Sequence, residues 1–340
     1  MRVLMRLGAA LGVSALLLYL AFRNVHFDAM WLAVRHADHR FTALFVLALV
    51  FIQLCRIYRF DLLIRPFARI STASLFRISN VGLMLILLLP LRLGELARPY
   101  MLKQESGAPL SSGLGAVVVE RVIDGLLVTL LFFVTTLGLG SRYHVPRALW
   151  LAALGALGIF VASLVVVVGT LIAHDRMFRL IRRWGARFSE AFTLRVLGML
   201  DAFVGGLRSL PDGRTVVMFI SWTLAYWAAN GLGLYAIMRS FGWDLPVVAG
   251  FTLVCVLVIG IMIPAGPGNL GTFQGALLAG LAIFGIGPTD AAAYGMVVYP
   301  VTLVVQLAFG LPYLVGGRMR MREIVGVSAK EPAASALPGR

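Results

Sequence analysis

The sequence predicts an all-α integral membrane protein with about eight transmembrane helices and one or two re-entrant or broken helices. Hydrophobic residues fill 60% of its 340 positions and charged residues only 13%, roughly half the charged fraction of a soluble domain. The apolar residues form unbroken runs near the ~20-residue length that a helix needs to cross a bilayer. Barrel strands would alternate apolar and polar residues instead. Because lipid offers the backbone no hydrogen-bond partners, the spans must be helical.

Seven apolar runs are long enough for simple spans, and two more are short or interrupted. The long runs lie at 4–22, 41–60, 114–138, 148–172, 215–238, 247–263 and 291–315. The short segments are 75–90, which ends at Pro90, and 272–286, which follows a turn rich in Pro and Gly. Such segments often form re-entrant or broken helices that line a transport site. We expect 272–286 to cross and 75–90 to dip into the cytoplasmic side, although the sequence also permits the opposite behaviour of each.

The basic residues predict the orientation of these spans. With both ends in the cytoplasm, 23 of the 30 Lys and Arg residues fall on the cytoplasmic side and six on the other. This bias orients membrane proteins. We therefore expect a multi-pass protein of the bacterial cytoplasmic (inner) membrane with cytoplasmic N- and C-termini. The first apolar run lacks a small-residue cleavage site, so we expect it to be a retained span rather than a signal peptide.

The chain is predicted to form a single polytopic membrane domain over residues 1–322. Residues 323–340, rich in Ala, Pro and Ser, are predicted to be a disordered cytoplasmic tail. Residues 176–209 are predicted to be a cytoplasmic connector, in which apolar residues recur at helical spacing opposite a row of arginines. That pattern is typical of an amphipathic helix on anionic headgroups, with a solvated linker helix as the alternative. Lipid contact also explains the net charge of +15, so we expect no nucleic-acid partner.

The sequence shows no motif for a cofactor, a metal or an enzymatic reaction. Cys55 and Cys255 each lie inside an apolar run, without a Cys or His at ligand spacing. No phosphate-binding loop, nucleophile elbow, zinc-protease motif or dinucleotide fingerprint occurs. We therefore expect no cofactor, no metal site and no enzymatic activity.

Charged residues within apolar sequence are the strongest site candidates, because each is costly in lipid and normally has a partner and a task. The first cluster is 90–99. If Glu95 and Arg98 share a helical turn, their spacing permits an ion pair. Arg92 then stays available for an anion such as a lipid phosphate, which arginine binds with two parallel hydrogen bonds. The alternative is a cytoplasmic loop whose charges pair and snorkel.

The second cluster is Glu120, Arg121 and Asp124 near the start of a span. Asp124 lies four residues after Glu120 and three after Arg121. They either contribute to a site or form a structural salt-bridge lock. Two further arginines, Arg56 and Arg59, stand at the end of the second predicted span. We expect these two to snorkel toward the interface.

The third candidate is the Pro/Gly turn before 272–286. A chain break there exposes backbone N–H groups at a helix N-terminus, where the dipole is positive, and so offers an anion site without a basic side chain. An ordinary interhelical loop is the alternative. The candidate residues are Pro264, Pro267, Gly268, Asn269, Gly271 and Gln274.

Three motifs in this order resemble the lysylphosphatidylglycerol synthase transmembrane (flippase-like) family: Pro90-x-Arg92-x-Gly94-Glu95-x-x-Arg98, Glu120-Arg121-x-x-Asp124 and Pro264-x-x-Pro267-Gly268-x-x-Gly271-x-x-Gln274. The family was formerly an uncharacterised membrane group and includes a hopanoid-associated membrane protein. The resemblance covers about residues 5–318 and implies re-entrant segments and transfer of lipids across the bilayer. The soluble domain that aminoacylates phosphatidylglycerol has no counterpart here, so we do not expect a synthase. Gln274 stands where many relatives carry an acidic residue.

We therefore expect a flippase-like lipid translocase for an anionic or phosphate-bearing lipid. Arg92 and Arg121 would bind the phosphate, with Glu95 and Asp124 balancing their charge. The alternative is a non-transporting membrane partner of a lipid or polyprenyl-phosphate glycosyltransferase, and a third reading is a membrane-embedded transferase with Glu95 or Asp124 as its base. The expected partners are membrane lipids and a membrane-associated lipid-modifying enzyme, and a homo-oligomer is compatible with the sequence.

Overall fold

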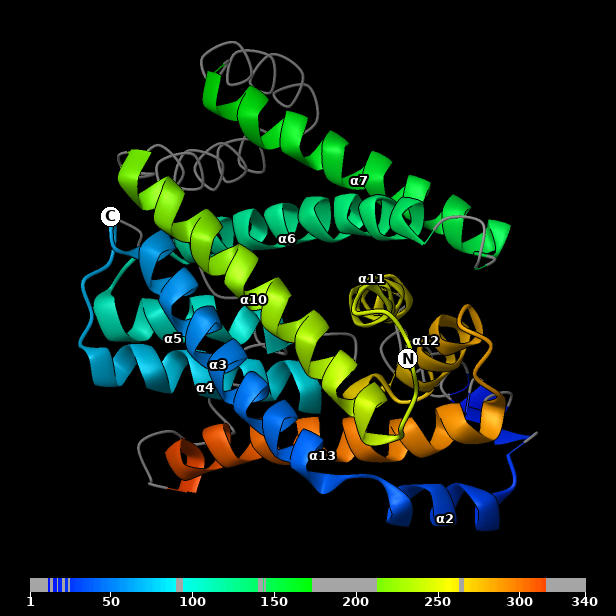
Figure 1. Cartoon of the computed structure of the whole chain (residues 1–340). Coiled ribbons are helices and arrows are strands. Elements are labelled where there is room, and N and C mark those ends of the chain that lie inside the picture. The colour runs from blue at the N-terminus through cyan, green and yellow to red at the C-terminus, as the bar shows by residue number, and fades with distance from the viewer. Residues whose placement is uncertain are drawn as a thin grey trace, which may run out of the picture.

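The computed structural model of the chain is helical, with no strand among the residues that it describes (Figure 1). The described residues are 12, 15–16, 18–19, 22–23, 25–89, 94–139, 143, 145–172, 213–262 and 266–315. The predicted all-α class is confirmed for them. The connector at 176–209, the tail at 323–340 and two candidate residues, Arg92 and Pro264, lie outside this part of the chain.

Most of the described helices overlap the predicted apolar runs, whereas the two ten-residue helices Phe27–His36 and Ala97–Ser106 were not predicted, and most of the first run, 4–22, lies outside the described residues. In chain order the described helices are α2 (Phe27–His36), α3 (His39–Ile64), α4 (Thr72–Leu88), α5 (Ala97–Ser106), α6 (Leu110–Gly138), α7 (Arg147–Ile172), α10 (Gly213–Ser240), α11 (Val248–Ile261), the 3-10 helix η3 (Pro267–Asn269), α12 (Thr272–Ala282) and α13 (Pro288–Val315). The predicted run at 247–263 is a shorter helix than a simple span requires. The 14 residues of α11 extend about 21 Å at 1.5 Å per residue, against ~30 Å of hydrocarbon.

Four of the described helices are long and apolar enough to cross a membrane, namely α3, α7, α10 and α13. The helices α4, α11 and α12 are apolar but shorter. A fifth long helix, α6, has 29 residues and carries three charged residues near its middle. The structure thus shows a polytopic helical membrane protein, and the count of eight spans stays a prediction.

Local sequence explains where several helices begin and end. The Ser71 side chain accepts a hydrogen bond from the Ser74 backbone N–H at 3.1 Å and caps α4. Gly107, which adopts a left-handed φ of 71°, ends α5. Pro109, two residues after Gly107, directly precedes the first residue of α6. The chain therefore reverses between α5 and α6 within three residues, and the two helices pack against each other.

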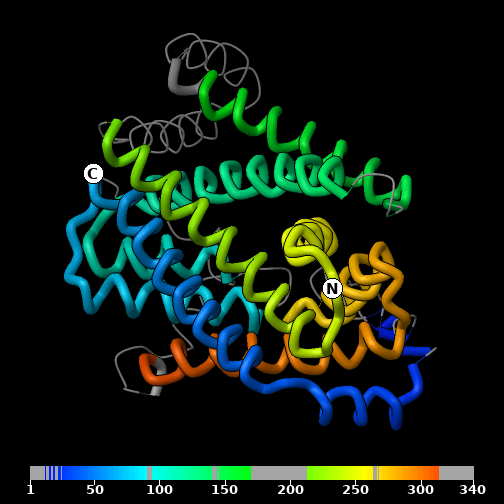
Figure 2. The backbone as a smooth tube through the Cα atoms, viewed as in Figure 1, coloured from blue at the N-terminus to red at the C-terminus, as the bar shows by residue number. Residues whose placement is uncertain are grey.

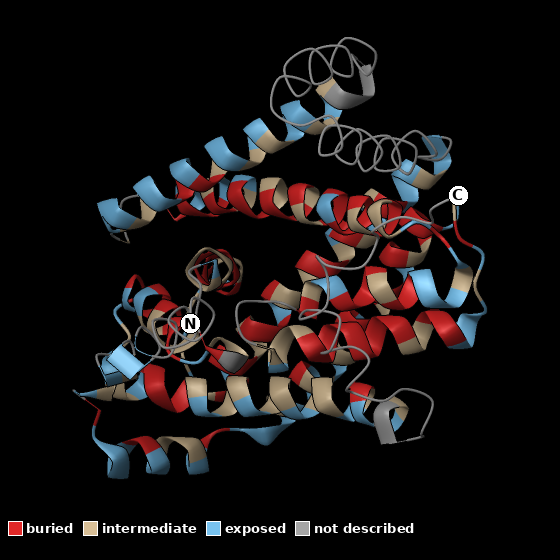
Figure 3. Cartoon of the chain, turned by 180° about the vertical axis from the view of Figure 1, so that it is seen from behind, coloured by how far each residue is buried: buried red, intermediate tan, exposed pale blue. Residues whose placement is uncertain are grey.

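Three buried clusters hold the described helices together. The largest joins α3, α6, α10, α11, α12 and α13 and includes Ala153 of α7. The second joins the later part of α3 with α4, α5, the first half of α6 and Phe219 of α10, and a small third cluster joins α2 to α13. Figure 2 shows α3 and α10 side by side over much of their length. The helices α10 and α11 approach so closely that a Cβ on Gly250 would lie 2.3 Å from the Gly231 carbonyl oxygen. In contrast, α7 lies at the edge of the bundle with most of its residues exposed (Figure 3).

Candidate functional site

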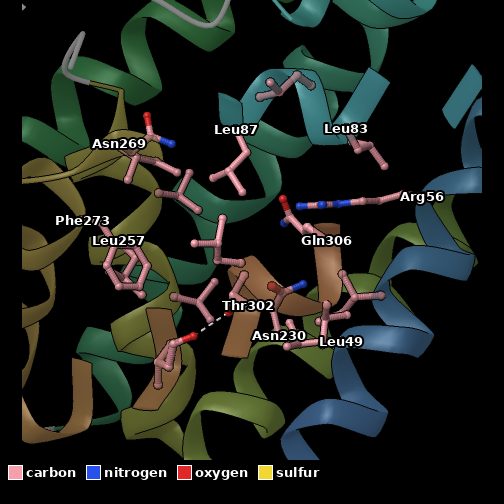
Figure 4. A pocket seen from close by; sticks show the side chains of 18 of the residues that line it. Leu49, Arg56, Leu83, Leu87, Asn230, Leu257, Asn269, Phe273, Thr302 and Gln306 are labelled. Atoms are coloured by element: carbon pink, nitrogen blue, oxygen red, sulfur yellow. Dashed lines mark hydrogen bonds between the residues drawn. The ribbon is translucent and has the colours of Figure 1, made fainter. Parts of the chain in front are cut away.

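A cavity of about 250 Å³ lies where α3, α4, α6, α10, α11 and α13 meet the η3 turn (Figure 4). Its described charged residues are Arg56 from α3, Arg121 from α6 and Glu95 from the segment before α5. Most of the other lining residues are aliphatic or aromatic. Cavities for drug-sized ligands usually measure about 300–1,000 Å³. At about 250 Å³, this cavity is slightly smaller than that range, and its few polar side chains lie among mostly apolar lining residues.

Beside the cavity, Arg59 and Asp124 form a buried ion pair between α3 and α6. The Arg59 Nη2 atom lies 2.6 Å from Asp124 Oδ1, and the side chains are 0% and 10% exposed. The Trp227 Nε1–H donates to the same oxygen at 3.2 Å. The Arg59 guanidinium also lies 5.1 Å from the Tyr226 ring centroid. The expectation that Arg59 snorkels to the interface is wrong, because α3 continues to Ile64 and keeps this side chain inside the bundle.

A second buried pair joins α5 to α6. The Arg98 Nη2 atom lies 3.0 Å from Glu120 Oε2, and the side chains are 0% and 1% exposed. The other Glu120 oxygen lies 3.6 Å from Arg121 Nη2. Arg98 therefore pairs with a neighbouring helix and not with Glu95 in its own turn. Glu120 and Asp124 of α6 are thus held in buried salt bridges to α5 and α3, and Glu120 also lies beside Arg121 of its own helix.

The two cavity arginines each contact a described residue. Arg56 donates from Nη2 to the Tyr226 hydroxyl at 3.1 Å, and its guanidinium lies 5.4 Å from that ring. The Arg121 side chain remains 39% exposed. A guanidinium has five N–H donors, so both arginines can donate further hydrogen bonds into the cavity. The arrangement can bind an anion between Arg56 and Arg121.

The Pro/Gly turn forms the cavity wall opposite α3. Gly268, Asn269 and Gly271 have positive φ angles of 73°, 53° and 87°, which bend the chain sharply. The Tyr299 hydroxyl donates to the Gly268 carbonyl at 2.9 Å and anchors the turn to α13. The Gln274 Oε1 accepts the Gly271 N–H at 2.7 Å and caps α12. One donor of the proposed backbone anion site is thus occupied by the protein itself.

The structure sorts the predicted site residues into groups. Glu95, Arg121, Gly268 and Asn269 line the cavity. Arg98, Glu120 and Asp124 take part in the ion pairs beside the cavity. Pro267 begins η3, and Gly271 and Gln274 form the hydrogen bond that caps α12 after the Pro/Gly turn.

Sequence reasoning missed several residues of the site. The cavity is also lined by Arg56, Gln53, Tyr226, Trp227, Asn230, Thr302 and Gln306. One available signal was that Asn230 and Gln306 are amides inside otherwise apolar helices.

Across the described ranges, no group of three His, Cys, Asp or Glu residues could hold a metal ion.

The fold and the cavity define a polytopic helical membrane protein with a charged site among its helices. Residues 7–310 match the family model described as the lysylphosphatidylglycerol synthase TM region, and the chain belongs to this family. The expected resemblance is thereby confirmed.

Curated relatives from archaea are similar over most of the chain. Glycosyltransferase AglD of Haloferax volcanii is 24% identical over 292 residues, which cover 78% of this chain and 46% of that protein. A UPF0104 membrane protein of Methanothermobacter thermautotrophicus is 24% identical, covering 59% of this chain and 62% of its own length. UPF0104 membrane protein MJ1078 of Methanocaldococcus jannaschii is also 24% identical, and the match covers 61% of this chain and 82% of that protein. The chain thus spans less than two thirds of the first two proteins, and no solved structure matches.

Proposed function

We propose that the protein is a flippase-like lipid translocase whose cavity binds the headgroup of an anionic or phosphate-bearing lipid. One observation carries the proposal: Arg56 and Arg121 reach a single cavity among apolar helices, with Glu95 as the acidic residue of its described lining. Arginine binds phosphate oxygens with paired N–H donors. A cavity of about 250 Å³ accepts a headgroup while the acyl or polyprenyl tails stay in the bilayer.

The charges of the site favour an anionic ligand. The buried arginines Arg59 and Arg98 are each compensated by a carboxylate from α6. Arg121 lies 3.6 Å from Glu120, which also pairs with Arg98, so the described residues of the cavity and of its two ion pairs hold four arginines against three carboxylates. Binding of a phosphate offsets the remaining positive charge, in a setting where unbalanced charge is costly. Arg92, expected to be the second phosphate ligand, lies outside the described residues, and Arg56 is the partner of Arg121 in this proposal.

We also infer the membrane, the orientation and the energy source of transport. We place the protein in the bacterial cytoplasmic membrane with both termini inside, following the charge bias of the sequence. The sequence has no nucleotide-binding motif, so transport is downhill or ion-coupled.

Lipid scrambling in proteoliposomes tests this function. Fluorescent phosphatidylglycerol is reconstituted with the wild-type chain, Arg56→Gln, Arg121→Gln or the control Arg65→Gln, which alters a 65% exposed arginine. We expect wild type and control to accelerate exchange between leaflets, and the two cavity variants to lose at least nine tenths of that acceleration. Folded wild-type protein that moves lipid no faster than protein-free vesicles would rule out the translocase, and unchanged rates in both variants would rule out the site.

A second candidate is a non-transporting membrane partner of a lipid or polyprenyl-phosphate glycosyltransferase. The similarity to a protein named as a glycosyltransferase favours it, since the match covers 46% of that protein and leaves its remainder without a counterpart here. In that case the purified chain would move no lipid and would co-purify with a glycosyltransferase made in the same cells. Lipid transfer by the chain alone would contradict this candidate.

A further inference from the structure

Uncharged polar side chains gather on the side of the cavity that holds Arg56. Figure 4 shows Arg56 and Gln306 reaching toward each other, with Asn230 and Thr302 nearby and Phe273 across the cavity. These polar residues come from α10 and α13, whose other lining residues are mainly apolar or aromatic. Asn230 and Thr302 each donate one hydrogen bond to a backbone carbonyl of their own helix at 2.7 Å, and each keeps an oxygen that can accept from a ligand. Polar groups in an apolar environment are unfavourable unless they are hydrogen-bonded. Their convergence on one cavity therefore indicates a polar ligand at this point.

Two of the amides, Asn230 and Gln53, are oriented by hydrogen bonds within the protein and keep further hydrogen-bonding capacity. Asn230 Nδ2 donates to the Tyr226 carbonyl at 2.7 Å. Gln53 Nε2 donates to Asn80 Oδ1, also at 2.7 Å, and is buried. A side-chain amide has two N–H donors and an acceptor oxygen, so one such bond fixes its orientation and leaves further capacity for a ligand.

The chemistry of this lining separates three kinds of headgroup. A second phosphate would be matched by further cations, and an ammonium group by several carboxylates. Amides instead both donate and accept, and the Thr302 hydroxyl, which donates to the Val298 carbonyl, still accepts. Such a lining suits hydroxyl groups, which also donate and accept. The aromatic residues Tyr226, Trp227, Phe273 and Tyr299 supply apolar surface for a ring or carbon chain between those hydroxyls.

We propose that the transported headgroup carries a neutral, hydroxyl-rich group, a polyol or a sugar, beside its phosphate. The phosphate lies between Arg56 and Arg121, and the hydroxyl groups bind the amides of Asn230 and Gln306. This inference rests on the proposed function and names the substrate class of the same site. A site built to bind hydroxyl groups discriminates strongly against ligands that lack them, because its polar groups are then left unpaired.

The test compares three fluorescent lipids with identical tails in proteoliposomes of the full chain. Phosphatidylinositol carries a polyol, phosphatidic acid has the phosphate alone, and phosphatidylethanolamine has an amine. We expect phosphatidylinositol to move at least tenfold faster than the other two after subtraction of the protein-free rate. Equal rates for phosphatidylinositol and phosphatidic acid, or a preference for the amine, would overturn the inference while leaving translocation intact.

Two variants connect the preference to the amides. Asn230→Leu and Gln306→Leu keep similar volume without the amide, and Gln104→Leu changes an exposed amide outside the cavity. We expect the first two to lower the preference for phosphatidylinositol over phosphatidic acid about tenfold and the control to retain it. An unchanged preference in both cavity variants would overturn the assignment of these residues.

Binding in detergent, measured by native mass spectrometry with the same three lipids, separates the two proposals. Preferential binding of phosphatidylinositol without transport would reject the translocase and retain the headgroup assignment. Absence of both binding and transport would reject both.

Discussion

Arg98 Nη2 lies 3.0 Å from Glu120 Oε2, and the two side chains are 0% and 1% exposed. The Arg98 guanidinium also lies 4.7 Å from the Phe60 ring centroid, so the pair links α3, α5 and α6. Burying two charges costs much of what their attraction returns, and removal of one partner is worse because the other is left unpaired. The pair therefore fixes the arrangement of these helices more than it adds net stability.

Removal of one member of this pair should destabilise the protein strongly. We expect Arg98→Leu to lower the free energy of unfolding by about 3–5 kcal/mol, because Glu120 stays buried without its main partner. The double variant Arg98→Leu/Glu120→Leu should recover part of that loss. Thermal unfolding in detergent, followed by intrinsic fluorescence, measures both. A single variant no less stable than the surface variant Arg65→Leu, for which we expect about 0–1 kcal/mol, would contradict the role of the pair.

The same pair depends on a glycine in a neighbouring helix. A Cβ on Gly82 of α4 would lie 2.2 Å from Arg98 Cγ, a distance that forces the arginine side chain to move. We expect Gly82→Ala to weaken the pair and lower the unfolding temperature. The matched control is Gly158→Ala on α7, where the added methyl group meets nothing within 4 Å and helix propensity favours Ala by about 1 kcal/mol. Equal effects of the two substitutions on the unfolding temperature would refute this explanation.

The helical membrane class could be predicted from the sequence because apolar run length and charge content report it directly. The pairing of charges could not, because the spacing of Glu120, Arg121 and Asp124 gives their positions on one helix but not which helices pack against it. The position of Arg59 shows the same limit. Four residues after Cys55, it resembled a span end, whereas its partner Asp124 lies 65 residues further on.

The turn at Gly268 and Asn269 was predicted from its Pro and Gly content, but that it lines one cavity together with Arg121 was not. The cavity forms only when η3, α6 and α13 come together, which depends on long-range packing. Local patterns therefore identified many of the site residues individually, while the cavity that unites them required the structure.

Two arginines on α3, three residues apart, should respond differently to the same substitution. Arg59→Gln leaves buried Asp124 without its charged partner, so we expect a loss of about 3 kcal/mol or more in the free energy of unfolding. Arg56→Gln removes a hydrogen bond to the Tyr226 hydroxyl and should cost only about 0.5–1.5 kcal/mol. Unfolding temperatures of the two variants, purified side by side, check the contrast. Similar losses in both would show that Arg56 is also a structural residue.

The last prediction concerns the cap of α12. Gln274 Oε1 accepts the Gly271 N–H at 2.7 Å, so Gln274→Leu should lower the free energy of unfolding by about 1 kcal/mol. Gln274→Glu keeps an acceptor oxygen and adds negative charge at the positive end of the helix dipole, worth about 0.3–1 kcal/mol. We therefore expect the Glu variant to be at least as stable as wild type and the Leu variant to be less stable, as measured by thermal unfolding at pH 7. The reverse order would show that Gln274 does not act through this hydrogen bond.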